Sequence, residues 1–427
     1  MVNMMPRKPI WLLLLITLLC GFLFYRMTYL THIDSLSGRT GTDTQGDVST
    51  HRSSNTATSS PNRTVTPKLA VVTCGDRLNL TLMNVKSVVA FSRGPLHMLL
   101  FADPPNMDFL LKELSKWPRK VRQRVTVEVR PVTFPKDRSK KWKGLFKPCA
   151  SQRLFLPRLL PEVDALIYVD ADILFLRPIE DLWDIFNQMN SSQIAGLTPE
   201  TEDYTTNWYT RFARHPYVRP LGVNSGVMLM NLTRMRQFNW DSRLEPVLLK
   251  YERYISWGDQ DLINIIFHDH TDKLLIFPCQ WNFRPDHCWY GPTCPKETPA
   301  ILHGNRNAFV EAKKEPAFRL VFDMMDKYVL ETSLVEDFVN PLEAALEKMT
   351  TTYCRKELLK HVPGWKRVAS SIDKDRLQDH RSITPNNSLA SPFAQNRYVS
   401  SAVRHESWQW TCSYKEEQTG QTPHKVV

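Results

Sequence analysis

Apolar runs of strand length alternate with segments of helical spacing through the middle of the chain. Lys68–Cys74 and His97–Phe101 are such runs, and Leu78–Phe91 between them repeats apolar residues at the interval of a helix. A strand, a helix and a strand in this order form a right-handed crossover, which pairs the strands in parallel. Further runs lie at Val125–Val132, Ala165–Val169, Val227–Leu232 and Leu274–Phe277. The pattern predicts an α/β domain with a mostly parallel sheet flanked by helices.

Helical spacing recurs in three further segments, at Phe146–Leu160, Phe318–Tyr328 and Val335–Lys348. We expect Pro157 to shorten or kink the first of these helices, because proline lacks a backbone donor. From Pro363 to Val427 the chain is polar, and we predict a tail that carries no chemistry. A disulfide between Cys354 and Cys412 is one way to hold this tail.

The N-terminal part predicts a membrane anchor followed by a flexible stem. The uncharged apolar run Ile10–Tyr25 follows Arg7 and Lys8, and with the residues up to Leu30 it approaches the roughly 20 residues of a membrane helix. A cleaved signal peptide is the alternative, but no small-residue cleavage site follows the run. The predicted organisation is a cytosolic tail (1–9), a signal-anchor (10–30), a luminal stem (31–67), a catalytic domain (68–330) and a C-terminal helical extension with a polar tail (331–427).

Charge and cysteine content favour a secreted-pathway enzyme over a nucleic-acid binder. The formal net charge is +11, but the densest basic stretches, Arg119–Arg124 and Lys136–Lys143, contain few aromatics for base stacking and predict a solvated surface. Five glycosylation triplets begin at asparagines 62, 79, 190, 231 and 386. The cysteines beyond the anchor would lie in the lumen, where disulfides persist. For Cys279, Cys288 and Cys294 around His287, we therefore prefer disulfides to a zinc site.

Two aspartates interrupt a core-forming segment. Asp170, Ala171 and Asp172 follow the strand Ala165–Val169, and apolar residues resume at Ile173. Buried carboxylates are costly unless they hold a cation, and open α/β sheets bind ligands at the carboxyl ends of their strands. We interpret the pair as a site for a divalent metal that binds a diphosphate. The alternative is that both residues only turn the chain.

Other polar residues stand at the ends of predicted elements. Asn224 and Ser225 precede Gly226 and an apolar strand, where an amide could bind sugar hydroxyls or simply form a turn. Asp259 and Gln260 begin a helix, where Asp259 is either its N-cap or a group facing a donor sugar; Asp261 is predicted to be structural. His303 ends the apolar segment that begins at Ala300, and Arg153 either contacts the donor or packs its stem at the surface.

The ordered motifs VVTCGD, YVDAD, NSGVMLMNL, WGDQDLIN and LHG resemble those of the retaining glycosyltransferases of the glycogenin and bacterial galactosyltransferase family, and the flanking text resembles the glucoside xylosyltransferases within it. The resemblance covers about Lys68–Tyr328. It implies a GT-A type, Rossmann-like mixed sheet and transfer of xylose from UDP-xylose, in α1,3 linkage, to O-linked glucose on EGF-like repeats of the Notch type. It further implies a type II membrane protein of the Golgi or endoplasmic reticulum.

The resemblance also implies roles for single residues. Asp170, Asp172 and His303 match the family's metal ligands, for Mn²⁺ or another divalent cation. The implied donor-binding residues are Thr73, Cys74, Arg153, Ala171, Asn224, Ser225 and Gly304, and the implied catalytic residues are Asp259, Gln260 and Asn224. Many relatives carry HxxGxxK after the histidine, whereas this chain has Gly304 beside His303, Arg306 and Phe309. The diphosphate lysine therefore has no assigned match, with Arg306 as a candidate.

Alternatives from other classes follow from the same residues. An aspartyl-nucleophile phosphohydrolase also begins with two aspartates after a strand, but it needs Thr or Val where Leu174 stands. An inactive carbohydrate-binding protein would not need the intact aspartates and histidine. A related transferase using UDP-glucose or UDP-galactose shares every motif. For the mechanism we favour same-face attack, with Asp259 as the candidate nucleophile of a covalent alternative.

Overall fold

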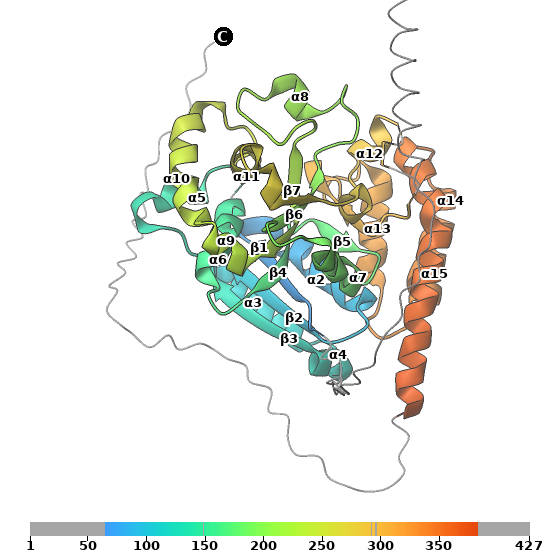
Figure 1. Ribbon diagram of the computed structural model, residues 1–427. Helices are drawn as coiled ribbons and strands as arrows, with labels where there is room; N and C mark the ends of the chain where they lie inside the picture. The colour runs from blue at the N-terminus through green and yellow to red at the C-terminus, as the bar shows by residue number, and fades with distance from the viewer. Residues whose placement is uncertain (1–64, 148, 292, 295–296, 383–427) are drawn as a thin grey trace, which may run out of the picture. The chain divides into compact units, whose positions relative to one another are not determined.

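The computed structural model describes residues 65–147, 149–291, 293–294 and 297–382, and the structural statements below refer to these residues (Figure 1). The chain divides into a unit of residues 1–63 and a unit of residues 64–427, and the described residues belong to the second. The predicted cytosolic tail, anchor and nearly all of the stem lie outside them. Among the described residues, no helix has the length and apolar character needed to cross a membrane.

A seven-stranded mixed sheet forms the centre of the described unit. Its strands are β1 (Lys68–Thr73), β2 (Leu96–Ala102), β3 (Val125–Pro131), β4 (Ala165–Val169), β6 (Ala195–Pro199), β7 (Val223–Asn231) and β8 (Leu274–Ile276). Their order is β3-β2-β1-β4-β7-β6-β8, and β7 runs antiparallel to both of its neighbours while the other pairs are parallel. This confirms the predicted α/β class. A separate antiparallel pair joins β5 (Ile173–Phe175) to β9 (Ile301–His303).

Helices cover both faces of the sheet, which explains why its strands are continuous apolar runs. In β1, Leu69 and Val71 pack into one core cluster while Ala70 and Val72 pack into another. The first cluster includes α2 (Leu78–Phe91), α13 (Pro316–Lys327), α14 (Asn340–Lys348) and α15 (Tyr353–Ser382), and the second includes α9 (Leu232–Gln237), α10 (Trp240–Tyr251) and α11 (Asp259–His268). Figure 1 shows α13, α14 and α15 together beside the sheet.

The remaining helices are short and connect these elements. They are α3 (Pro104–Ser115), α4 (Arg119–Arg124), α5 (Ser139–Lys143), α6 (Leu156–Leu159), α7 (Ile179–Trp183), α8 (Trp208–Phe212) and α12 (Asp286–Trp289). A π-helical turn, Val335–Val339, leads into α14, within the segment predicted to be helical.

One helix prediction is wrong, and one helical segment was predicted only to be polar. The predicted helix Phe146–Leu160 is instead a 3₁₀ segment, Ala150–Phe155, followed by α6, because Cys149 adopts a left-handed φ of 66° that ends any helix there. Pro157 stands in the first turn of α6, where it is tolerated, and does not kink the helix. The polar tail predicted from Pro363 is helical as far as Ser382, since the apolar residues Trp365, Ala369 and Ile372 recur at helical spacing and are buried.

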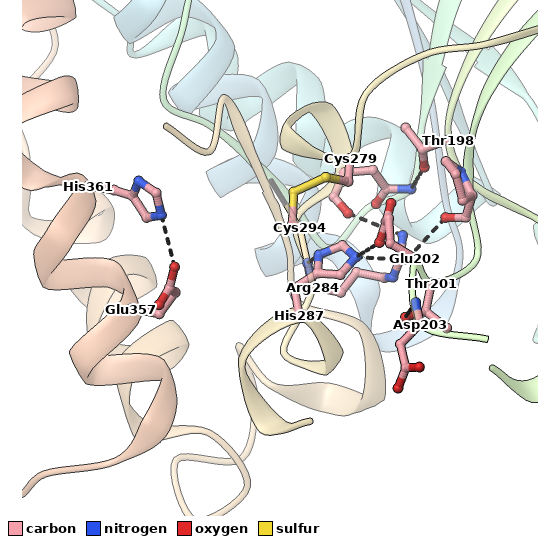
Figure 2. Close-up of a disulfide and its surroundings, with 12 residues drawn as sticks. Thr198, Thr201, Glu202, Asp203, Cys279, Arg284, His287, Cys294, Glu357 and His361 are labelled. Carbon is pink, nitrogen blue, oxygen red and sulfur yellow. Dashed lines mark hydrogen bonds and ion pairs between the residues drawn. A yellow bond between two sulfur atoms is a disulfide. The ribbon is translucent and has the colours of Figure 1, made fainter. Parts of the chain in front are cut away.

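Three disulfides link distant segments. Cys74 pairs with Cys149, Cys279 with Cys294 and Cys288 with Cys354. The preference for disulfides over zinc is therefore confirmed. The predicted Cys354–Cys412 staple is wrong, because Cys354 bonds to Cys288; Cys412 lies outside the described residues. Figure 2 shows the Cys279–Cys294 bond beside His287, whose Nε2 lies 2.9 Å from Glu202 Oε2.

Candidate active site

The three predicted metal ligands converge at the carboxyl end of β4. Asp170 and Asp172 follow β4, and the pairing of β5 with β9 places His303 opposite Ile173. A hydrogen bond of 2.8 Å from the Gly304 amide to the Asp172 carbonyl continues this pairing. His303 Nε2 lies 3.4 Å from Asp172 Oδ1 and 3.8 Å from Asp170 Oδ2, and one ligand atom from each residue lies within 4.8 Å of the others. Two carboxylates and one imidazole at this spacing fit a divalent cation.

Gly226 leaves the space that the His303 ring occupies. A Cβ at position 226 would lie 2.3 Å from His303 Cε1, a separation that real Cβ atoms do not show. The Gly226 carbonyl also accepts from the Asp170 amide at 2.9 Å. Gly226, which lies within β7, is therefore required because the His303 ring approaches it. The sequence indicated only that some group comes close to the backbone at this glycine.

A chain of amide hydrogen bonds fixes the proton on His303. The Gly226 amide donates to Asn224 Oδ1, which therefore accepts, and Asn282 Nδ2 donates to the same oxygen at 2.9 Å. Asn282 Oδ1 is then left to accept from His303 Nδ1 at 2.8 Å. The proton resides on Nδ1, and the Nε2 lone pair faces Asp170 and Asp172. An outer hydrogen bond of this kind orients a metal-binding histidine.

Arg153 joins the metal-site carboxylate to the first residue of α11. Its guanidinium lies 2.5 Å from Asp170 Oδ1 and 2.8 Å from Asp259 Oδ2, and it donates to the Ser225 carbonyl. The Arg153 guanidinium carbon lies 4.3 Å from the centroid of the Tyr168 ring. Arg153 is only 3% exposed, so the alternative of a surface arginine is wrong. Both carboxylates raise the pKa of Arg153 against the effect of its burial.

A cavity opens beside these residues. It is lined by Val72, Cys74, Gly75, Asp76, Arg77, Phe146, Lys147, Ala150, Arg153, Tyr168, Asp170, Ala171, Asp172, Ser225, Trp257, Asp259 and Gln260. Thr73 is absent from this lining, because alternate residues of a strand face opposite sides and Thr73 points away from Val72 and Cys74. Gly304 and His303 also lie outside the lining, with His303 behind the two aspartates.

Two carboxyl groups at the cavity, those of Asp172 and Asp259, have pKa values shifted in opposite directions. Burial raises the pKa of Asp172, but the neighbouring His303 imidazole, with the charges of Lys147 and Arg77, outweighs it and lowers this pKa overall. For Asp259, burial dominates and raises the pKa despite the neighbouring Arg153 charge. The site thus holds one strongly anionic carboxylate next to the imidazole and one carboxylate stabilised by a single arginine.

Gln260 and Asn224 share one half-buried acceptor, Glu200. Glu200 Oε2 accepts from Asn224 Nδ2 at 2.8 Å and from Gln260 Nε2 at 3.2 Å, while Gln260 Oε1 accepts from the Ser225 amide. Gln260 lines the cavity, whereas the Asn224 amide is wholly engaged with Glu200, Asn282 and the Gly226 backbone. Asn224 therefore supports the site from behind. Glu200, a residue that the sequence did not single out, fixes both amides.

The start of α11 differs from the N-cap alternative. Gly258, with a φ of 59°, is the N-cap, and Asp259 is the first helical residue. Asp261 is fully buried and accepts from Tyr209 Oη at 2.8 Å and from the Ser256 and Trp257 amides. These contacts give Asp261 the structural role that was predicted for it. Asp259 does not cap the helix, and its side chain lines the cavity.

Several cavity residues were not predicted from the sequence. Phe146, Lys147 and Trp257 stand in segments that were considered for other residues, and the Phe146 and Trp257 rings meet edge to face at 5.6 Å. Asn282, which does not line the cavity but supports it, lies within the Cys-rich segment that was considered for its cysteines and His287 alone. Arg77 directly follows the VVTCGD motif, but its charge was not connected with the aspartates.

Comparison with known proteins identifies the family. The model of Glycosyl transferase family 8 matches residues 109–303. Glucoside xylosyltransferase 1 of Rattus norvegicus is 48% identical over 302 residues, covering 67% of this chain and 69% of the relative, and glucoside xylosyltransferase 2 of Xenopus laevis is 44% identical over 301 residues, covering 67% and 71%. The crystal structure of mouse xyloside xylosyltransferase 1 in its apo form is similar with a TM-score of 0.45 and 20% identity, covering 57% of this chain and 99% of that one. The resemblance inferred from the motifs is confirmed, and the phosphohydrolase alternative is wrong. The chain belongs to glycosyl transferase family 8.

Proposed function

We propose that this protein transfers xylose from UDP-xylose, in α1,3 linkage, to glucose that is O-linked to EGF-like repeats, with retention of anomeric configuration. The observation that carries the proposal is the convergence of Asp170, Asp172 and His303 beside a cavity, in a chain similar over 302 residues to a glucoside xylosyltransferase. Retention, the linkage and the repeat acceptor follow from the motif resemblance.

We assign Mn²⁺ to Asp170, Asp172 and His303. Bound there, it would supply Lewis-acid stabilisation of the charge that develops on the departing diphosphate. The chain's own residues hold this site in advance of the reaction: Asn282 orients the imidazole, and Arg153 fixes one oxygen of Asp170. A preformed arrangement of this kind needs little reorganisation when charge develops.

The transfer step exchanges one bond at the anomeric carbon. The bond from C1 of xylose to the β-phosphate oxygen breaks, and its electron pair stays on that oxygen. The acceptor hydroxyl attacks C1 on the same face, and its proton passes to the departing phosphate. We favour this route over a covalent intermediate because Asp259, the candidate nucleophile, is ion-paired with the buried Arg153 at 2.8 Å. Gln260 carries an amide, which is a poor nucleophile.

A luminal location in the Golgi or endoplasmic reticulum, with a type II anchor at residues 10–30, is part of the same proposal. Three disulfides among the described residues support an oxidising compartment.

A donor panel tests the proposal. The full chain is incubated with an O-glucosylated EGF-like repeat and UDP-xylose, UDP-glucose or UDP-galactose, with Mn²⁺ or with chelator. We expect the mass of the acceptor repeat to increase by one pentose only when UDP-xylose and Mn²⁺ are both present. Asp172→Asn should lose turnover while its circular dichroism stays unchanged. Transfer of a hexose would assign the sister activity instead, and undiminished transfer in chelator would contradict the metal assignment.

A further inference from the structure

The position that supplies the diphosphate lysine in many relatives cannot do so here. Arg306 lies 3.0 Å from Asp286 Oδ1 through its Nη2 and does not line the cavity. Phe309 is 1% exposed and packs in the core against Phe318 and Phe322. The candidate role of Arg306 thus has no support in the structure, and the charge of a diphosphate must be met by another residue.

The cations that line the cavity are Arg77, Lys147 and Arg153. Arg153 is bound to Asp170 and Asp259, and Arg77 lies 3.5 Å from Asp76 Oδ1. Lys147, in contrast, forms no ion pair with any residue in the described part of the chain. Its Nζ lies 5.6 Å from the centroid of the Phe146 ring, and the side chain is exposed. A charged donor at the cavity with no carboxylate partner is available to an anionic ligand.

Covalent and steric contacts hold the segment that carries Lys147. Cys149 is bonded to Cys74, at the carboxyl end of β1. The Ala150 amide donates to the Lys147 carbonyl at 3.1 Å, which forms a turn next to the disulfide. On the other side, Phe146 packs over Gly258, where an added Cβ would lie 2.4 Å from Phe146 Cβ. The segment is thereby placed between the end of β1 and the start of α11, facing the two aspartates across the cavity.

We propose that Lys147 binds the diphosphate of the nucleotide-sugar, in place of the lysine that relatives carry after the metal-binding histidine. This inference rests on the proposed function, because it requires a nucleoside diphosphate in the cavity. The Cys74–Cys149 disulfide places Lys147 at the cavity, because it joins the segment that carries Lys147 to the carboxyl end of β1. This segment lies far in the sequence from the family's histidine motif.

Titration with UDP and with uridine, both in the presence of Mn²⁺, tests the role of Lys147. Lys147→Ala should weaken UDP binding by about tenfold, the size of one charge-assisted hydrogen bond, and leave uridine binding unchanged. Lys147→Arg should restore most of the affinity because it keeps the charge. Lys143→Ala, which removes another exposed lysine of the same stretch outside the cavity lining, is the matched control and should bind UDP as the wild type does.

The outcomes separate this inference from the proposed function. If Lys147→Ala binds UDP as tightly as Lys143→Ala, the role of Lys147 is wrong while the transferase function stands. An equal loss for UDP and uridine would show that Lys147 only shapes the pocket, and would also overturn the inference. If the wild-type chain binds no UDP, the proposed function falls and the inference falls with it.

Discussion

Four buried histidines of the described residues lie near carboxylates, and two of them, His303 and His287, show why only the first belongs to a metal site. The His303 ring donates from Nδ1 to Asn282, so its Nε2 lone pair points toward Asp170 and Asp172. Both carboxylates approach the same nitrogen, and a cavity lies beyond them. His303 can therefore supply a nitrogen ligand without first losing a proton.

His287 shows the opposite arrangement (Figure 2). Its Nδ1 accepts from the Arg284 amide at 3.0 Å, so Nε2 carries the proton, and Nε2 lies 2.9 Å from Glu202 Oε2. The Arg284 guanidinium lies 3.3 Å from Nε2 and occupies the place of a cation. His287 thus has a structural role, because it contacts both its own turn at Arg284 and the segment of Glu202.

The difference shows that a histidine near a carboxylate does not by itself define a metal site. The direction of the hydrogen bond to the other ring nitrogen decides which nitrogen keeps a lone pair. Two structural elements set that direction here: a side-chain amide facing His303, and a main-chain amide facing His287. Neither is visible in the sequence pattern around either histidine.

Replacing each histidine should separate the two roles most strongly. His303→Ala should lower transfer by about 10³-fold, because a charged transition state loses a metal ligand. His287→Ala should keep most of the activity per folded molecule but melt at a lower temperature, since Glu202 and Arg284 lose a buried partner. Initial rates with saturating UDP-xylose and thermal unfolding measure both effects. Comparable rate losses in the two variants would contradict the distinction.

A methyl group at Gly226 should disturb His303 most, because its other close neighbour, Asn224 Oδ1, would lie 3.0 Å away. In Gly226→Ala the new Cβ would lie 2.3 Å from the ring, so the imidazole must rotate away, and we expect activity to fall by about 100-fold. Mn²⁺ affinity, measured by calorimetry, should fall with it. Gly94→Ala is the control, because its Cβ would contact only Glu180 Oε1 at an ordinary 3.8 Å. Full activity in Gly226→Ala would show that His303 does not need its present position.

The sequence predicted those site residues whose position depends on neighbours in the chain, and it missed those whose position depends on distant contacts. Asp170 and Asp172 were found because acids that interrupt an apolar run are anomalous within a few residues. His303 was found at a strand end, and pairing of β5 with β9 then placed it beside them. Lys147 was missed because the spacing of its segment predicted a helix, whereas the Cys74–Cys149 bond, a distant contact, set its conformation.

The polar residues behind the site were also beyond local prediction. From the residues alone Asn224 could either bind sugar hydroxyls or form a turn, and the motif resemblance implied that it lines the sugar. In the structure β7 begins at Val223, so Asn224 lies within the strand and its amide is used by Glu200 and Asn282. Which partner a buried amide selects depends on segments far along the chain.

Removing the amide behind His303 should have a moderate effect. Asn282→Ala deletes the acceptor that keeps the proton on Nδ1, and loss of such an outer hydrogen bond typically costs about 10- to 100-fold in metal affinity. We expect the apparent activation constant for Mn²⁺ to rise, with kcat partly restored at high metal concentration. Thr198→Val, which removes another partner of Asn282 Nδ2 at 3.0 Å, should change the constant less. An unchanged constant in Asn282→Ala would show that the amide does not orient the ring.

The smallest expected effect is the contribution of His287 to the pH dependence of stability, which the difference between the wild type and a His287 variant isolates. Burial and the Arg284 charge lower the pKa of His287 below its ordinary 6.5, against the raising effects of Glu202 and Asp286. The unfolded chain then takes up a proton near pH 6.5 that the folded chain does not, so this contribution to stability is full above that pH and declines as the pH falls. His287→Gln keeps an N–H for Glu202 but cannot titrate. Its free energy of unfolding should therefore decline less than that of the wild type between pH 7 and about pH 5.5, by on the order of 1 kcal/mol. Denaturant unfolding at both pH values measures the difference. Parallel declines would mean that His287 is protonated in the folded protein, and the proton placement inferred from the Arg284 amide would then be wrong.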